Sequence, residues 1–187
     1  MKGGITVFNN FGIYSEEERI EKIAEHIKEI SSLLGINVTD SNVDTPYRVA
    51  KMYVREVFKN QNVNIFQLKN QMKVFDNEGT NKPITVRGVP FSSMCEHHWL
   101  PFMGTVSVTY IPDEKIIGLS KIPRVVKYFS KKPQLQERLT NEIGEFLVDL
   151  LKPKYLKVEM TATHTCVLCR GAESPAETDT EFTYRGE

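Results

Sequence analysis

The sequence contains no hydrophobic stretch long enough to cross a lipid bilayer, which takes about 20 consecutive apolar residues. Its longest uncharged run extends from Trp99 to Pro112 and is interrupted by Pro101 and Gly104. The N-terminus also has no apolar segment of the kind found in signal peptides. We therefore expect a cytoplasmic protein that makes no contact with a membrane.

A net charge is also absent, since 24 lysines and arginines balance 24 aspartates and glutamates. Proteins that bind nucleic acid generally carry an excess of basic residues. The neutral balance therefore argues against a nucleic-acid partner, although it leaves room for a local basic pocket.

Cysteine is scarce, and the three cysteines are an odd number. Without an export signal, metal ligation or free thiols are better expectations than disulfides. The sequence also lacks the glycine-rich motifs G-x-x-x-x-G-K-[ST] and G-x-G-x-x-G. Phosphate binding by a P-loop or by a Rossmann fold is therefore not supported.

What is present is the composition of an ordinary globular protein, because 40% of the 187 residues are hydrophobic and 26% are charged. This length favours one domain that builds its own core. We expect a single domain over residues 1–187, with an N-terminal helical region over 1–60 and the main body over 83–187.

Two helices are predicted near the N-terminus, after an irregular arm. A capping-box pattern at Ser15 precedes an apolar stripe that runs from Ile20 to Leu34 at helical spacing, which predicts a helix with one buried face. A second helix is predicted to begin at Asp44, whose side chain can cap it. Residues 59–82, rich in Asn and Lys, are then expected to form a long excursion that is partly ordered at best.

The remainder of the chain alternates between strands and helices. Period-two alternation predicts strands at 85–89, 105–111 and 156–163 and a last edge strand at 181–184, while helical spacing predicts helices at 120–130 and from 133 to 151. Helices followed by strands, then two helices and more strands, indicate an α+β fold.

The densest chemistry lies in two short clusters, Cys95-Glu96-His97-His98 and His164-Thr165-Cys166-Val167-Leu168-Cys169. Thiolate and imidazole ligands this close together suit zinc. A structural site would use four protein ligands, which Cys95, His98, Cys166 and Cys169 could supply. A catalytic site would use three and leave one position open, so that His97 and His164 remain for proton transfer. Spacing alone does not choose between these two sites.

A second informative stretch surrounds Ser120, which is suited to the N-cap of the helix that follows. Lys121 and Arg124 are neighbours on one helix face, and five basic residues with no acid lie between Lys121 and Lys132. A helix N-terminus attracts anions. The stretch is therefore either a phosphate subsite or a solvated basic face. In the next helix, Glu137 lies opposite the apolar stripe, and we expect it to face solvent unless a partner surface covers it.

Several motifs in a fixed order closely resemble GTP cyclohydrolase I over residues 15–171. They are 44–53 (DTPYRVAKMY), 95–98 (CEHH), 118–124 (GLSKIPR), 134–140 (QLQERLT), 164–166 (HTC) and 170–171 (RG). The resemblance implies the tunnelling (T-fold) class, an antiparallel sheet with helices on one side, with the catalytic core over 83–187. It also implies a homo-oligomeric ring, usually a decamer in bacteria, with active sites between subunits.

The resemblance further implies the reaction, in which a hydrolase of cyclic amidine C–N bonds converts GTP to 7,8-dihydroneopterin triphosphate and formate. This is the first step of tetrahydrofolate and pterin biosynthesis. By position, the implied zinc (Zn²⁺) ligands are Cys95, His98 and Cys166, the catalytic residues are His97, His164 and Ser120, and the substrate-binding residues are Arg48, Lys121, Arg124, Gln136, Glu137 and Arg170.

The chain departs from the family pattern at two places. Cys169 is not among the family's usual ligands, and it would close the open zinc position if it bound the metal. Residues 172–175 carry an acidic residue where the family continues with a basic one. These departures keep two alternatives open: a non-catalytic, zinc-stabilised ring that binds a nucleotide, and a T-fold enzyme that acts on a related purine nucleotide.

Overall fold

The computed structural model describes residues 12–62 and 64–186. The chain divides into two compact units, Met1–Val57 and Phe58–Glu187. Most of the irregular arm expected at the N-terminus lies outside the described residues, and the single domain expected over 1–187 stays a prediction. No helix within the described part of the chain is long and apolar enough to cross a membrane.

The first unit contains the two helices expected near the N-terminus. Helix α1 spans Glu16–Leu33, and α2 spans Thr45–Met52 and continues into a π-helical turn, η1, at Tyr53–Val57. The predicted capping box is confirmed, because the Ser15 N–H donates to the Glu18 carboxylate at 2.7 Å and the Glu18 N–H donates to Ser15 Oγ at 3.3 Å.

Two expectations for this unit were wrong. The apolar stripe of α1 is not buried along its length, since Ile20 is fully buried but Leu34, just beyond the helix, is 71% exposed. Helix α2 has eight residues against eighteen in α1, so it is too short to cover the whole stripe. The Asp44 side chain makes no capping hydrogen bond, and its carboxylate lies 3.5 Å from the guanidinium of Arg48 instead.

The second unit begins with ordered structure where an irregular excursion was expected. Residues 59–82 include helix α3, Ile65–Asn70, and strand β1, Val74–Asp76, which pairs with β4, Lys115–Ile117. The Asn64 side chain caps α3, because its Oδ1 accepts a hydrogen bond from the N–H of Gln67 at 2.9 Å. The prediction failed because the polar composition of this stretch hid the cap of α3 and its buried residue Leu68.

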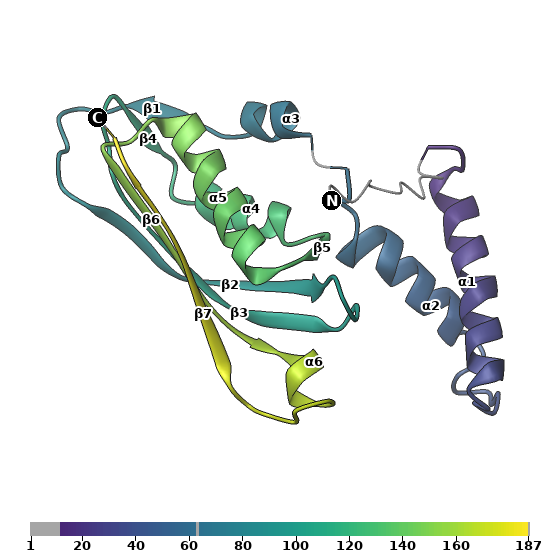
Figure 1. Ribbon diagram of the computed structural model, residues 1–187. Coiled ribbons are helices and arrows are strands. Elements are labelled where there is room, and N and C mark those ends of the chain that lie inside the picture. Colours follow the sequence, from purple (N-terminus) through teal and green to yellow (C-terminus); the bar gives the residue numbers. More distant parts are fainter. Residues whose placement is uncertain (1–11, 63, 187) are drawn as a thin grey trace, which may run out of the picture. The chain divides into compact units, whose positions relative to one another are not determined.

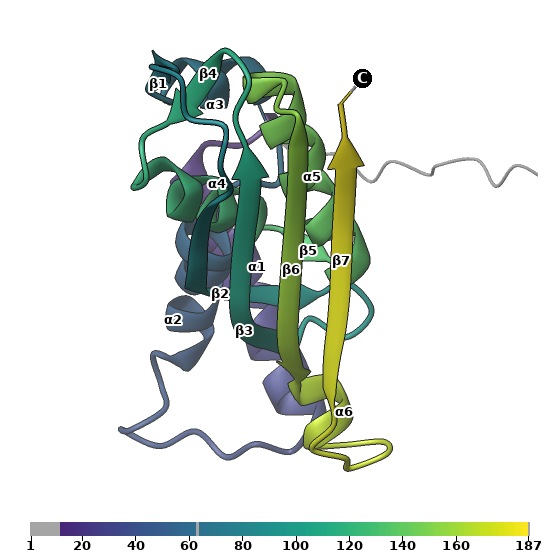
Figure 2. The same ribbon diagram turned by 90° about the vertical axis from the view of Figure 1, so that its left-hand side faces the viewer.

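A five-stranded sheet forms the body of the second unit. Its strands are β2 (Ile84–Cys95), β3 (Pro101–Ile111), β5 (Pro133–Gln134), β6 (Tyr155–His164) and β7 (Glu177–Arg185), in the order β5-β2-β3-β6-β7. All neighbours are antiparallel except β2 and β5. Figure 2 shows the four long strands side by side, with β7 as the expected edge strand.

Helices α4 (Lys121–Phe129) and α5 (Gln136–Leu151) cover one face of this sheet (Figure 1). The alternation predicted over 105–111 is confirmed in β3, whose residues Val106, Val108 and Tyr110 share one face and are at most 1% exposed. Helix α5 starts at Gln136 rather than Pro133, because Pro133 and Gln134 pair with the end of β2 as strand β5. The fold is the expected α+β class with helices on one side of a largely antiparallel sheet.

Strand β3 approaches β6 closely at Gly104. A Cβ atom placed on Gly104 would lie 1.9 Å from the backbone oxygen of Thr161, whereas one on Gly118 would have no neighbour nearer than 3.7 Å. Backbone atoms cannot rotate out of the way as a side chain can. Only glycine therefore fits at position 104 with the two strands in this arrangement.

We expect Gly104→Ala to lower the free energy of unfolding by about 1–3 kcal/mol, because the added methyl group forces the strands apart. The matched control, Gly118→Ala, is expected to stay within about 1 kcal/mol of the unchanged protein. Urea denaturation followed by circular dichroism measures both. Equal stability of the two variants would contradict the close approach.

Candidate metal centre and active site

The first ligand cluster lies on a tight reversal between β2 and β3. Strand β2 ends at Cys95, whose N–H donates to the Leu100 carbonyl at 2.8 Å and whose carbonyl accepts from the Trp99 N–H at 2.8 Å. Trp99 has a φ of 52°, in the left-handed region, which lets the chain turn back within so few residues. The reversal leaves the imidazoles of His97 and His98 exposed at its tip.

The second cluster lies where β6 passes directly into the short helix α6, Thr165–Leu168. His164 is the last residue of β6 and pairs in register with Phe102 on β3. The Thr165 hydroxyl donates to the Pro101 carbonyl at 2.6 Å, which ties the start of α6 to the start of β3. Strand β3 therefore holds both clusters at the same end of the sheet.

The two clusters meet in a group that can hold a metal ion. One ligand atom each from Cys95, His98 and Cys166 lies within 4.8 Å of the others. The Cys95 sulfur is 3.9 Å from His98 Nδ1, a spacing that two ligands of one zinc ion can have, since each lies roughly 2.0–2.3 Å from the metal. Two sulfurs and one imidazole are a donor set that suits zinc.

Cys169, the fourth candidate ligand, is engaged elsewhere. Its exposed thiol donates to the Thr165 carbonyl at 2.7 Å, and it is not part of the three-residue group found among the described residues.

Burial raises the pKa of the Cys166 thiol, and the neighbouring Cys95 sulfur raises it further.

His164 is held from two sides. Its ring stacks on that of Phe102, with centroids 4.7 Å apart and the planes 1° from parallel, and its Nε2 lies 2.8 Å from Gln136 Oε1. The Gln136 amide nitrogen donates to the Thr178 carbonyl at 2.8 Å, so its oxygen faces His164 as an acceptor. The His164 proton therefore resides on Nε2, which leaves Nδ1 of the neutral ring as a base.

The surroundings of His164 also set its charge. Its pKa lies below the ordinary value, because burial disfavours the charged imidazolium, while the negative charge of Glu137 opposes this effect. Glu137 itself is exposed, as expected from its position opposite the apolar stripe of α5. Helix α5 thus places an acceptor and a carboxylate beside His164 from two consecutive residues.

Other residues singled out in the sequence join this cluster. His97 Nδ1 lies 3.9 Å from the Cys95 sulfur, and Arg170 donates to His98 Nε2 at 2.8 Å. The structure therefore brings together the three ligands and five further residues, which are His97, Gln136, Glu137, His164 and Arg170.

The remaining expected residues lie elsewhere. Ser120, Lys121 and Arg124 stand at the beginning of α4, where Ser120 occupies the N-cap position without a side-chain capping hydrogen bond. Within the described chain, no hydrogen bond or ion pair links their side chains to the metal-ligand group. Arg48 belongs to the first unit, on α2.

Sequence reasoning missed three residues that support the site. Phe102 stacks on His164, and Arg138 forms an ion pair with Glu96, which lies between the ligand Cys95 and His97. Glu96 and Arg138 stand inside recognised motifs, so their charges were visible. The contacts join residues 42 and 62 positions apart, and no local pattern reveals such pairs.

A model of the GTP cyclohydrolase I family matches residues 23–187. This chain belongs to the GTP cyclohydrolase I family. Relatives named GTP cyclohydrolase 1 from Shewanella sp. (strain W3-18-1), Shewanella baltica (strain OS185) and Shewanella sp. (strain ANA-3) are each 42% identical over 171 residues, which cover 90% of this chain and 78% of theirs.

Among solved structures, the apo form of an archaeosine synthase QueF-Like aligns with a TM-score of 0.45 at 19% identity, and the alignment covers 59% of this chain and 99% of that one. The family match over residues 23–187 includes the two ligand clusters, α4 and the first turn of α5. It confirms the family that the sequence motifs indicated.

The Gln136 amide offers a direct test of how the site is held together. We expect Gln136→Leu, which keeps the volume, to cost about 1–3 kcal/mol of unfolding free energy, because it removes the hydrogen bonds to the Met160 and Thr178 carbonyls and takes away the acceptor of the His164 N–H. Urea denaturation measures the loss. Asn141→Ala, at an exposed position of the same helix, should change stability by less than about 0.5 kcal/mol. Equal stability of the two variants would show that the Gln136 contacts are dispensable.

Proposed function

We propose that this member of the GTP cyclohydrolase I family hydrolyses GTP to 7,8-dihydroneopterin triphosphate and formate, with zinc as its cofactor. This is the entry step of tetrahydrofolate and pterin biosynthesis. The proposal rests on one observation: ligand atoms of Cys95, His98 and Cys166 lie within 4.8 Å of one another, and His164 stands two residues before Cys166. A cytoplasmic location, where thiols stay reduced, stays a prediction.

Cys95, His98 and Cys166 are the residues that would hold the zinc ion. Three protein ligands leave a fourth coordination position, as catalytic rather than structural zinc sites do. Zinc held by these residues would supply Lewis acidity and, at neutral pH, a water-derived nucleophile for C8 of guanine.

His164 is suited to move the proton that ring opening requires. Its lowered pKa keeps the imidazole largely neutral at neutral pH, so Nδ1 can accept a proton and pass it to the imidazole nitrogen of guanine that must leave. Phe102 and Gln136 fix the ring plane and the tautomer. We assign His97, together with Ser120, to the later rearrangement of the ribose.

Glu137 is proposed to recognise guanine. Its exposed carboxylate can accept from the N1–H and the amino group of guanine, a donor pair that adenine lacks. Gln136 is 2% exposed and its side chain is bonded to His164, so we propose that it supports guanine binding by holding His164 next to Glu137.

The triphosphate is proposed to bind the basic residues at the start of α4 together with Arg170 and Arg48. Ser120, Lys121 and Arg124 combine two cations with a helix N-terminus, and their side chains have no ion-pair partner within the described residues. Because no hydrogen bond or ion pair among the described residues links these side chains to the metal-ligand group, we propose that the site is completed between subunits of a homo-oligomer, a decameric ring.

The decisive experiment is incubation of the zinc-loaded protein with GTP. We expect the absorbance and fluorescence of dihydroneopterin triphosphate to appear, with GTP preferred over ATP. His164→Ala should lower turnover by a factor of at least 10² while leaving zinc bound, because proton transfer by one side chain contributes about 10²–10⁴. Absence of product from the unchanged, assembled protein would refute the proposal.

The ligand set is tested separately by metal content. We expect Cys166→Ser to lose zinc on dialysis and Cys169→Ser to keep one zinc per chain, because the Cys169 thiol is directed to a backbone carbonyl. Mass spectrometry of the metal measures both, and X-ray absorption should show two sulfur ligands. A third sulfur ligand would instead support the closed, structural site.

A further inference from the structure

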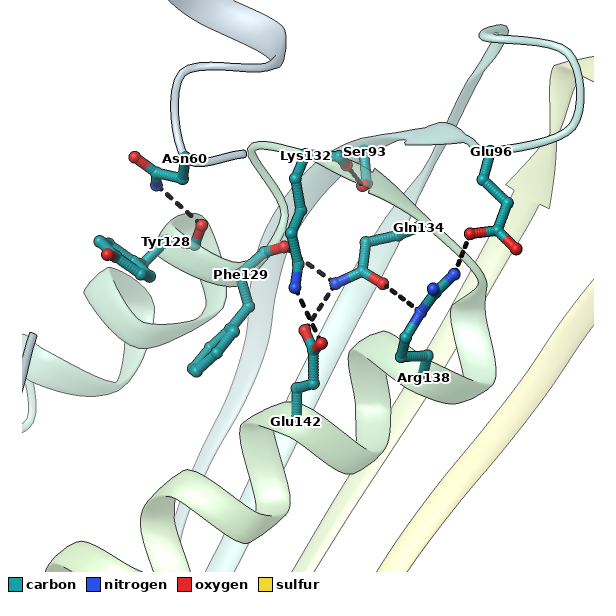
Figure 3. Close-up of polar contacts among 9 residues, drawn as sticks. All are labelled: Asn60, Ser93, Glu96, Tyr128, Phe129, Lys132, Gln134, Arg138 and Glu142. Atoms are coloured by element: carbon teal, nitrogen blue, oxygen red, sulfur yellow. Dashed lines mark hydrogen bonds and ion pairs between the residues drawn. The ribbon is translucent and has the colours of Figure 1, made fainter. Parts of the chain in front are cut away.

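A chain of polar side chains extends from the end of α4 to the metal-ligand turn (Figure 3). Lys132 donates to Glu142 at 2.8 Å, Gln134 donates to the same carboxylate at 2.7 Å, and the Gln134 oxygen accepts from Arg138 Nε at 3.1 Å. Arg138 then forms an ion pair with Glu96. The network ends at the residue between the ligand Cys95 and His97.

Gln134 is the centre of this network and is fully buried. Its amide nitrogen also donates to the Phe129 carbonyl at 3.2 Å, so neither end of the amide lacks a partner. A buried amide with all its groups bonded has one orientation, because a rotation would leave buried polar atoms unpaired. The oxygen that receives Arg138 is therefore held in a fixed position.

The backbone of Gln134 also bonds to the turn that carries the candidate ligands Cys95 and His98. Gln134 pairs with Cys95 in the parallel β2–β5 bridge, and its carbonyl accepts from the Glu96 N–H at 3.1 Å. Glu96 is thus held twice, by its backbone from β5 and by its carboxylate from Arg138. The side chain of Glu96 is 31% exposed and that of Arg138 is 43% exposed, so water screens part of the ion pair.

The first turn of α5 consequently reaches both halves of the metal centre. Gln136 holds His164 at the end of β6, and Arg138, two residues later, holds Glu96 in the turn after β2. Among the described residues, no hydrogen bond or ion pair joins Arg138 to the side chains of Cys95, His98 or Cys166. Any effect of Arg138 on metal binding therefore acts through Glu96.

We propose that Arg138 is a positioning residue for the metal centre, which holds the Cys95–His98 turn in its ligating arrangement through Glu96. The proposal rests on the zinc site of the proposed function. Two effects follow from the ion pair. The ion pair restrains the turn that carries Cys95 and His98. It also keeps the carboxylate of Glu96, which is adjacent to Cys95, from binding zinc in a wrong arrangement.

The test is the affinity of the full-length protein for Zn²⁺, measured by competition with a chelating dye, together with the visible spectrum of the Co²⁺-substituted protein. We expect Arg138→Ala to bind Zn²⁺ 10–100-fold more weakly, the range typical for outer partners of metal ligands, and to shift the Co²⁺ bands. Arg138→Lys, which keeps the charge, should recover part of the affinity.

Lys115→Ala is the control, because Lys115 also forms an ion pair with a carboxylate, that of Asp76, and this exposed pair lies outside the proposed site. It should bind Zn²⁺ as the unchanged protein does. In a double-mutant cycle, Glu96→Ala combined with Arg138→Ala should weaken binding no more than Arg138→Ala alone, because each change by itself already removes the Arg138–Glu96 ion pair.

The proposal is overturned if Arg138→Ala binds Zn²⁺ within twofold of the unchanged protein with the same Co²⁺ spectrum. If Arg138→Ala does not fold, the Zn²⁺ affinity of Glu96→Ala is measured instead, because this variant removes the same ion pair. The same twofold limit then decides the outcome. Failure of the proposed function is a separate result: an unchanged protein that binds Zn²⁺ but does not convert GTP refutes the catalytic proposal and leaves this one standing.

Discussion

The pairing of β3 with both of its neighbours is the constraint on which the rest of the site depends. On one side, β3 continues directly from the turn that follows Cys95, and on the other its residue Phe102 pairs with His164. Because side chains alternate along a strand, a shift of one residue on either side would turn a ligand cluster to the other face. The close approach at Gly104 helps to keep this register.

Helix α5 adds a second layer of control over the same region. Its apolar face packs on the sheet, with residues such as Leu139 and Ile143 fully buried, so the position of its first turn follows from the core. From there, Gln136 and Arg138 reach the two ligand clusters. Hydrophobic burial supplies the stability, and a few satisfied polar contacts convert it into a defined arrangement of the site.

Helices and strands with a regular spacing of hydrophobic residues were predicted well, whereas elements that depend on single contacts were not. The alternating residues of β3 and the apolar face of α5 correspond to the structure because burial selects one face of each element. Residues 59–82 were misjudged because α3 depends on one cap and one anchor. The burial of the apolar stripe of α1 was overestimated, because the spacing of apolar residues shows which face of a helix is apolar but not whether another element covers that face.

The sequence by itself determined the family, the candidate ligands and the candidate substrate-binding residues, because these reside in short motifs whose chemistry is local. Tertiary structure decided which of them meet. It joined Cys95 and His98 to Cys166 across the sheet, directed Cys169 to a backbone carbonyl, and placed Arg138 against Glu96. Such contacts depend on strand register and helix packing, which arise from the whole core and not from neighbouring residues.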